Sequence, residues 1–375
     1  MSRGLRGLQP HVANRLPPEP SSDTRLAGLI GDHPSRYSQS PAIWNAAFRA
    51  LGLDALYVPL DVDPLALPGI VAACRQEPRF LGANITVPHK QAIVPLLDEL
   101  DSSAERVGAV NTVVRTPEGW LIGANTDGRG AVDSLIGVWP GRDAPFLPTL
   151  ARKSVLLIGA GGSARAVAFA LAEALGPEGR LFIANRTAET ALELGRAVNA
   201  LFGNAGGLDE ADAELLAPGL DLLVNATTRG QAGPRPAGPG RLAYLEPFSS
   251  LAPADPPTIP ERSGEPEADR LRAWFPTAIG DIQANHAASI RFITRAAPTT
   301  AFFDLIYAPP ETVMLRHARW SGRPTLNGQG MILYQAVAAL CDWISRPELE
   351  SRGLDPEAAR QRVLEAMATA WDPGR

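Results

Sequence analysis

The fold is decided by the stretch Ser154-Val-Leu-Leu-Ile-Gly-Ala-Gly-Gly-Ser-Ala-Arg-Ala-Val-Ala-Phe-Ala-Leu-Ala-Glu173. Its first part, Val155 to Ile158, is an apolar run of the length typical of a buried parallel strand. Three glycines follow almost at once, and an Ala- and Leu-rich pattern without a helix breaker then continues from Ala164 to Leu175. This order predicts a strand, a glycine turn and a helix.

Such a turn is suited to a dinucleotide. A backbone without Cβ atoms can turn sharply and approach a pyrophosphate closely. The helix N-terminus adds free N–H groups and the positive end of the helix dipole. The competing interpretation is a strand-turn-helix unit that binds nothing. The predicted cofactor-binding residues in this stretch are Gly159, Ala160, Gly161, Gly162, Ser163 and Ala164.

The next strand indicates which dinucleotide binds. Residues 180–184 read as the second strand of a βαβ unit, and Asn185-Arg186-Thr187 follows directly. An NAD-specific fold usually has Asp or Glu about 20 residues past the glycines, to hold the ribose 2′-hydroxyl. Here a neutral Asn precedes Arg186, and arginine attracts a 2′-phosphate that a carboxylate would repel. We therefore predict NADP as the cofactor, the alternative being that Arg186 lies on a solvated helix start.

Length and composition are those of a globular enzyme. The 375 residues suggest about two or three domains, and 45% hydrophobic with 20% charged residues is ordinary for a soluble protein. The net charge of −5 argues against a nucleic-acid partner. No apolar run approaches the roughly 20 residues of a membrane span, so no membrane partner is expected.

The cysteines, the histidines and the N-terminal segment add three expectations. Cys74 and Cys341 form no CxxC pair, which predicts reduced thiols in a cytoplasmic protein. The five histidines show no metal-ligand spacing, so no metal is expected. Residues 1–24 lack the apolar core of a signal peptide and are predicted to be a flexible tail, disordered or draped over the surface, with an organelle-targeting role left open.

The residues before the glycine turn predict a second α/β domain with a largely parallel sheet. Ser40 is expected to cap the helix at 42–51, with Pro41 in its first turn. The predicted strands are 25–31, 55–60 and 80–87, the predicted helices are 42–51, 64–74 and 90–100, and a hairpin is predicted from 107–114 and 121–124.

Two charged residues of this domain are candidates for catalysis. Lys90 follows a strand end, at the edge of the sheet where α/β proteins place ligands, and Asp127 precedes the second domain. A partly desolvated lysine beside a carboxylate can act as a general acid or base and stabilise a developing alkoxide. The alternative is a surface lysine and a turn aspartate that never meet.

Seven motifs carry a resemblance to a known family. They are Ser38-Gln-Ser-Pro41, Gly82-Ala-Asn-Ile-Thr-Val-Pro-His-Lys90, Gly108-Ala-Val-Asn-Thr112, Gly123-Ala-Asn-Thr-Asp127, Val224-Asn-Ala-Thr227, Asp304-Leu-Ile-Tyr-Ala-Pro309 and Gly328-Gln-Gly-Met-Ile-Leu-Tyr-Gln335. In this order, and together with the glycine turn, they resemble the shikimate/quinate dehydrogenase family from about Leu26 to Ile344. Each motif alone is only modestly specific.

The resemblance implies a role for each matching residue. Ser38 and Ser40 would bind the substrate carboxylate, Lys90 and Asp127 would be the catalytic pair, and Leu305 and Gly328 would offer backbone contacts near the nicotinamide. Without the resemblance, Ser40 and Asn111 have plainer roles as a cap and a turn residue. The resemblance adds Thr86, Asn111, Tyr307 and Gln335 to the substrate-binding set, and Asn185, Arg186, Thr187, Asn225, Thr227, Leu305 and Gly328 to the cofactor-binding set.

The chain departs from the family pattern at several positions. Trp44 stands where the family commonly has His, and Thr190 stands where a second basic residue often grips the 2′-phosphate. Thr228-Arg229 replaces the usual Pro-Leu. The stretch from about 231 to 298 is a Pro- and Gly-rich insertion, with a charged loop expected at 261–269 and an added helix suggested by Ile279, Ile282, Ile290 and Ile293. It could shape the rim of the cofactor site, mediate an oligomer contact, or do neither.

The sequence thus predicts an α/β protein of two domains. Residues 25–130 with 328–375 would form the substrate-binding catalytic domain, and 131–327 a Rossmann-type NADP-binding domain, with C-terminal helices returning to the first. The implied activity is reversible NADPH-dependent reduction of 3-dehydroshikimate to shikimate in aromatic amino acid biosynthesis, by a monomer or homodimer. Within the resemblance, Ser40 favours shikimate, because quinate-preferring relatives often carry Thr at this position. The alternatives are a quinate or aminoshikimate dehydrogenase and a non-catalytic metabolite sensor.

Overall fold

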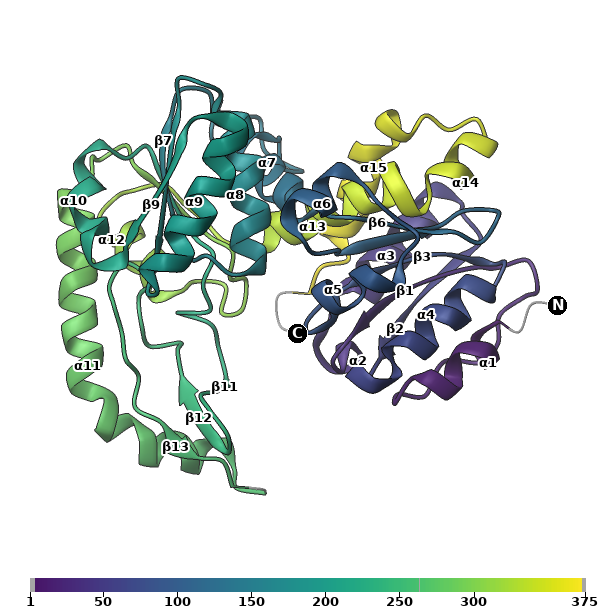
Figure 1. Cartoon of the computed structure of the whole chain (residues 1–375), viewed down its shortest axis with the longest axis horizontal. Helices are drawn as coiled ribbons and strands as arrows, with labels where there is room; N and C mark the ends of the chain where they lie inside the picture. Colours follow the sequence, from purple (N-terminus) through teal and green to yellow (C-terminus); the bar gives the residue numbers. More distant parts are fainter. Residues whose placement is uncertain (1–3, 263, 373–375) are drawn as a thin grey trace. The chain divides into compact units, whose positions relative to one another are not determined.

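The computed structural model describes residues 4–262 and 264–372 (Figure 1). The chain divides into two compact units, each with its own central sheet. Unit 1 is Met1–Pro145 with Met331–Arg375, and unit 2 is Phe146–Gly330. The two α/β units, one of them of Rossmann type, confirm the fold class predicted from the sequence.

Unit 1 is built on a six-stranded sheet in the order β2-β1-β3-β5-β6-β4. Only β5 runs against its neighbours, so the sheet of the described chain is largely parallel, as predicted. The predicted hairpin is formed by β5 and β6. Its first strand was predicted to begin at 107, but residue 107 ends a helix and the strand begins at Thr112. The strands are β1 (Arg25–Gly31), β2 (Ala55–Asp61), β3 (Phe80–Ile85), β4 (Glu99–Leu100), β5 (Thr112–Arg115) and β6 (Leu121–Ala124).

Helices cover both faces of this sheet because successive strand residues point to opposite sides. Ala27 and Leu29 of β1 pack with α3 and the C-terminal helices, whereas Leu26 and Ile30 pack with α4. Trp44, at the position where histidine was noted as common, is fully buried and stacks on Tyr57. The helices are α1 (Leu5–Leu8), α2 (Pro34–Tyr37), α3 (Ser40–Leu51), α4 (Leu67–Gln76), α5 (His89–Ala92), α6 (Ser102–Val107), α7 (Asp127–Ile136), α13 (Gln329–Ala338), α14 (Arg346–Ser351) and α15 (Pro356–Thr369).

The C-terminal helices return to unit 1, as predicted. Leu333 and Ala336 of α13 are buried with the α3 side chains. A π-helical turn (Ala339–Ile344) follows, and then α14 and α15. Asp355 caps α15 by accepting a hydrogen bond from the backbone of Glu357. Each large apolar side chain buried in this way contributes about 1.5–3 kcal/mol to stability.

Three local predictions for unit 1 need correction. The helix predicted over 90–100 is only α5 followed by a 3-10 turn (Val94–Leu96), because Pro95 has no N–H to continue an α-helix. Ser40 is the first residue of α3 rather than its cap, which is Gln39. The N-terminal segment, predicted to be flexible and either disordered or draped, is packed on the domain in its described part: Leu5 and Leu8 are buried in the same core as α4.

Unit 2 contains the predicted Rossmann sheet. Its six strands lie in the order β15-β14-β10-β7-β8-β9, and all neighbours are parallel. Counted along the sheet, this is the 3-2-1-4-5-6 order of a dinucleotide-binding fold. The strands are β7 (Ser154–Ile158), β8 (Arg180–Asn185), β9 (Ala205–Asp209), β10 (Leu222–Asn225), β14 (Ala301–Asp304) and β15 (Thr325–Leu326), and the flanking helices are α8 (Gly162–Leu175), α9 (Ala188–Phe202), α10 (Ala213–Leu216) and α12 (Val313–Trp320).

The insertion forms a small antiparallel sheet and one long helix (Figure 1). The sheet consists of β11 (Pro234–Pro236), β12 (Arg241–Tyr244) and β13 (Ile259–Pro260), and the helix is α11 (Glu267–Arg295). The added helix is therefore confirmed, but it begins inside the segment expected to be a charged loop. Trp274 of α11 packs against Tyr244 and Phe248, which fastens the small sheet to the helix.

No helix in the described ranges is both long and apolar enough to cross a bilayer.

Candidate active site and cofactor site

The polar side chains of unit 1 meet at one edge of its sheet. β1, β3 and β6 are parallel and end at Gly31, Ile85 and Ala124, while the antiparallel β5 begins there at Thr112. Residues that directly follow or precede these points therefore gather at the carboxyl edge, where α/β folds bind ligands. All the predicted substrate-binding and catalytic residues except Tyr307 and Gln335 come from these connections.

Lys90 and Asp127 are in direct contact. The Lys90 Nζ donates to Asp127 Oδ2 at 2.5 Å. The Asp127 side chain is 9% exposed, whereas that of Lys90 is 25% exposed. The Lys90 backbone is fixed as well, since its carbonyl accepts a hydrogen bond from Val110 N at 2.8 Å. The interpretation in which these two residues never meet is thus excluded, and the ammonium is held beside a carboxylate with one side open to solvent.

Lysine is rare in this chain, which makes its position informative. Lys90 and Lys153 are the only lysines in the sequence, and every other basic residue except histidine is an arginine. Arginine stays protonated in proteins, so it can stabilise charge but cannot transfer a proton. A lysine at the centre of the polar cluster is therefore suited to proton transfer. An arginine could not take over this role.

Asn111 connects the pair to the returning helix. Its Nδ2 lies 2.8 Å from Asp127 Oδ1 and 3.2 Å from Gln335 Oε1, on α13. Its Oδ1 accepts from the backbone N of Thr126 at 2.8 Å. Asp127 N in turn donates to Asn125 Oδ1. Asn111 is almost completely buried, so these bonds fix the orientation of the Asp127 carboxylate.

Three further residues position Asn111, and sequence reasoning did not single them out. The buried Tyr57 hydroxyl donates to Asn84 Oδ1 at 2.8 Å, and Asn84 Nδ2 donates to Thr112 Oγ1. Thr112 Oγ1 then donates to Asn111 Oδ1 at 2.9 Å. Asn84 and Thr112 both stand inside the quoted motifs, next to residues that were named. Their place in these motifs was a sign of a functional role. The neighbouring sequence, however, did not distinguish a positioning residue from a turn residue.

The remaining substrate candidates of unit 1 are half-buried, Ser38 and Thr86 between elements and Ser40 at the start of α3. Ser40 N donates to Ser38 Oγ at 3.1 Å, which sets the two hydroxyls on one turn. Thr86 N donates to the carbonyl of Ile30, and the Thr86 methyl group fills the space beside Gly31. Since Ser40 is not a helix cap, its hydroxyl is available for another role. The roles of Ser38, Ser40 and Thr86 in binding stay predictions.

Tyr307 differs from the other candidates because it belongs to unit 2, in the segment after β14. Burial raises the pKa of its hydroxyl, and the positive charge of Arg235 acts in the opposite direction. Its part in substrate binding stays a prediction.

The glycine turn of unit 2 is open where a dinucleotide needs space. Gly159 has φ 114°, a conformation that favours glycine. A Cβ atom at Gly161 or Gly162 would meet nothing within 4 Å, so both glycines face open space. No side chain caps α8, and its first turn contains no acidic residue. Its N–H groups are therefore free to bind a pyrophosphate, and the site fits the predicted cofactor.

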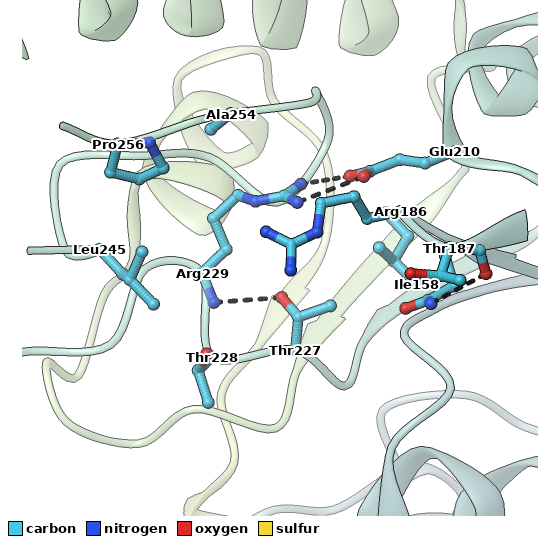
Figure 2. Close-up of a pocket in the computed structure, with 11 residues that line it drawn as sticks. Ile158, Arg186, Thr187, Glu210, Thr227, Thr228, Arg229, Leu245, Ala254 and Pro256 are labelled. Carbon is cyan, nitrogen blue, oxygen red and sulfur yellow. Dashed lines mark hydrogen bonds and ion pairs between the residues drawn. The ribbon is translucent and has the colours of Figure 1, made fainter. Parts of the chain in front are cut away.

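A pocket of about 230 Å³ lies at the ends of β7, β8 and β10 (Figure 2). Arg186 reaches into it, and Asn185, Thr187 and Thr227, also predicted to bind the cofactor, line it. Sequence reasoning missed seven lining residues: Ile158, Glu210, Thr228, Arg229, Leu245, Ala254 and Pro256. The last three belong to the insertion, so this segment forms part of the wall of the pocket.

The other predicted cofactor residues shape the backbone of unit 2. Asn225 is fully buried and donates to Asp304 Oδ1, and its own Oδ1 accepts from Thr227 N and Oγ1. Gly328 is pressed against Leu305, whose carbonyl oxygen would lie only 1.9 Å from a Cβ atom at position 328. Asn225 and Gly328 thus hold turns in place, and their contact with the cofactor stays a prediction.

The fold and the two sites define a class of protein. A Rossmann unit with an open glycine turn, and with an arginine where NAD-specific folds have a carboxylate, binds NADP. An α/β unit with a hydrogen-bonded Lys–Asp pair at its carboxyl edge has groups that are able to transfer a proton. Together they define an NADP-dependent oxidoreductase acting on a CH–OH group.

Comparison with known proteins gives the family. The shikimate dehydrogenase substrate binding domain model matches residues 29–113. The shikimate dehydrogenase (NADP⁺) of Shouchella clausii is 34% identical over 86% of this chain and 94% of its own. The structure of a Thermus thermophilus shikimate 5-dehydrogenase with NADP(H) and shikimate has a TM-score of 0.62 at 28% identity, covering 93% of this chain and 100% of that one. The chain belongs to the shikimate dehydrogenase family.

One further structure is relevant to substrate choice. A quinate dehydrogenase from Corynebacterium glutamicum in complex with NAD has a TM-score of 0.61 at 28% identity, covering 92% of this chain and 100% of that one. The same scaffold thus occurs in a protein named for another substrate.

Proposed function

We propose that this protein catalyses the reversible NADPH-dependent reduction of 3-dehydroshikimate to shikimate. The observation that carries the proposal is the Lys90–Asp127 contact, held by Asn111 at the carboxyl edge of unit 1. Its relatives named shikimate dehydrogenase (NADP⁺), such as that of Shouchella clausii, support the substrate and the cofactor.

The residues of this chain supply the proton and the orientation. When bound at α8 and Arg186, the cofactor supplies the hydride that reduces the ring ketone. Lys90 donates a proton from Nζ to the ketone oxygen as negative charge develops on it. Asp127 holds the ammonium in place, and Asn111 fixes the carboxylate. Because Lys90 is partly exposed, water can return the proton after each turnover.

A polyhydroxylated acid matches the remaining polar groups. Ser38 and Ser40 would bind its carboxylate, while Thr86, Asn111 and Gln335 would bind ring hydroxyls. Most of these groups are neutral and short, and they are held by the hydrogen bonds described above. A site of this kind rejects analogues that lack one hydroxyl, because a buried polar group is then left unpaired.

The direct test is an assay of the purified protein with shikimate and quinate, each with NADP and NAD. Shikimate with NADP should give the highest kcat/KM of the four combinations. A preference for quinate would move the protein to the alternative function on the same scaffold. Absence of turnover with every combination would support a non-catalytic sensor instead.

Replacing Arg186 with alanine should raise KM for NADP about tenfold or more and leave KM for NAD within about twofold. The reason is that a guanidinium contributes charge-assisted hydrogen bonds to a 2′-phosphate, a group that NAD lacks. Initial rates with both cofactors measure this. The matched control is Arg180→Ala, an exposed arginine at the start of β8 that does not line the pocket, which should change neither value. An equal increase for both cofactors in Arg186→Ala would contradict the cofactor assignment.

We further propose that unit 1 binds the substrate and unit 2 the cofactor, in a cytoplasmic protein that is a monomer or homodimer. Two free, buried cysteines, Cys74 and Cys341, are consistent with a reducing compartment.

A further inference from the structure

The cofactor pocket contains a carboxylate that should work against NADP binding. In the β8–β9 register, Asn185 is paired with Asp209, so Arg186 and Glu210 are the next residues on adjacent strand ends. Both line the same pocket. Glu210 is buried, with a side chain that is 5% exposed. An unpaired carboxylate here would repel a 2′-phosphate and compete with it for Arg186.

Arg229 neutralises this carboxylate. Its guanidinium forms a two-point ion pair with Glu210, through Nη1 to Oε1 and through Nη2 to Oε2 at 3.2 Å. The Arg229 side chain is only 11% exposed, so the pair is poorly screened by water. Figure 2 shows Arg186 extending into the pocket beside this pair. The ion pair leaves the charge of Arg186 available for an anion.

The insertion keeps Arg229 in this position. Arg229 Nη1 also donates to the carbonyls of Ser250, at 3.3 Å, and Ala252, at 2.8 Å. The segment that bears these carbonyls is fixed by Asn285 of α11, whose side chain bonds both backbone groups of Ser249 and the carbonyl of Ala252. The long helix and the loop in front of it therefore act together as the support of one guanidinium.

We propose that Arg229 is a positioning residue that determines cofactor specificity by holding Glu210 in a buried ion pair, and that the insertion is the support for this pair. The proposal rests on the proposed function in so far as NADP is the cofactor. It explains how a chain with threonine at position 190, where the family often has a second basic residue, favours a 2′-phosphate through Arg186.

The test measures binding without turnover. Calorimetry compares adenosine 2′,5′-bisphosphate with 5′-AMP, which lacks the 2′-phosphate, on the full chain. In Arg229→Gln, the affinity for the bisphosphate should fall about tenfold or more relative to the wild type, while that for 5′-AMP should stay within about twofold. Equal losses for both ligands, or no loss, would overturn the proposal by showing a structural role or none.

A double variant separates charge from shape. Arg229→Gln combined with Glu210→Gln removes both charges, so the bisphosphate preference should return to within about threefold of the wild type. A double variant as weak as Arg229→Gln alone would overturn the proposal. If circular dichroism shows that Arg229→Gln does not fold, the single variant Glu210→Gln takes its place. Its preference for the bisphosphate over 5′-AMP should rise about threefold. An unchanged or lower preference would overturn the proposal.

The control is Arg241→Gln, an exposed arginine of β12 that bonds Thr258 and does not line the pocket. It should leave both affinities unchanged. If the wild type shows the bisphosphate preference but does not oxidise shikimate, the proposed function fails while this inference stands. If shikimate is oxidised but the bisphosphate preference is independent of Arg229, this inference fails while the proposed function stands.

Discussion

Replacing Lys90 with alanine should lower kcat about a thousandfold while shikimate still binds. A positioned general acid contributes about 10²–10⁴-fold to rate, and the ammonium also stabilises the charge on the reduced oxygen. The substrate contacts proposed for Ser38, Ser40 and Thr86 do not involve the lysine, so affinity should change little. Single-turnover kinetics measure the loss, and shikimate titration of the variant measures binding.

Lys90→Arg sharpens this prediction. It keeps the positive charge next to Asp127 but cannot release a proton, because arginine remains protonated in proteins. Its kcat should therefore also fall by about a hundredfold or more. The matched control is Lys153→Ala, which breaks the other Lys–Asp contact of the described chain, with Asp221 at 3.3 Å in unit 2, and should leave kcat within about twofold. Undiminished kcat in Lys90→Ala would refute the role of Lys90.

Asp127→Asn should lower kcat about a hundredfold with a smaller change in KM. The two oxygens of Asp127 accept from two donors, Lys90 Nζ and Asn111 Nδ2. An asparagine side chain has only one oxygen, so in either orientation its NH₂ group faces a donor. The Lys90 ammonium therefore loses its negatively charged partner. In addition, one of the two donors no longer has an oxygen to bond. Steady-state kinetics with shikimate and NADP measure the effect.

Asp133→Asn provides the control on the same helix. Asp133 pairs with Arg129 on α7 and makes no contact with Lys90 or Asn111 in the described structure. Its substitution should leave kcat within about twofold. If Asp127→Asn and Asp133→Asn lowered kcat equally, the effect would reflect the stability of α7 rather than a special role for Asp127.

Much of the architecture was predictable because its signals are local. The strand–turn–helix at 154–175 follows from an apolar run, glycines and an uninterrupted helical pattern, and all three lie within one window of sequence. The start of the last helix was equally clear, since Asp355 and Pro356 are a typical N-cap and first helical residue. The helix predicted over 90–100 was wrong because the apolar periodicity continues across Pro95, whereas a proline has no N–H to continue an α-helix.

Predictions were weakest where tertiary packing decided the outcome. Leu5 and Leu8 look like part of a polar, proline-containing tail in the sequence, yet the groove beside α4 buries them. The insertion showed a helical pattern, but Ile279 and Ile290 are about half exposed while Ile282 and Ile293 are buried. Which side of such a helix is covered depends on Tyr244, Phe248 and the loop that they hold, and helical periodicity alone does not show this.

The sequence by itself determined the two α/β units and the glycine turn, and it singled out the arginine predicted to select NADP and the two members of the candidate Lys–Asp pair. The tertiary structure alone decided that Asn111 joins Asp127 to Gln335, that Tyr57 and Asn84 support it, and that Glu210 pairs with Arg229. The physical reason is the separation along the chain of the residues that interact. Glycine conformation and helix periodicity act between neighbours in the chain, whereas a hydrogen bond or buried ion pair needs atoms about 3 Å apart, which only folding brings together.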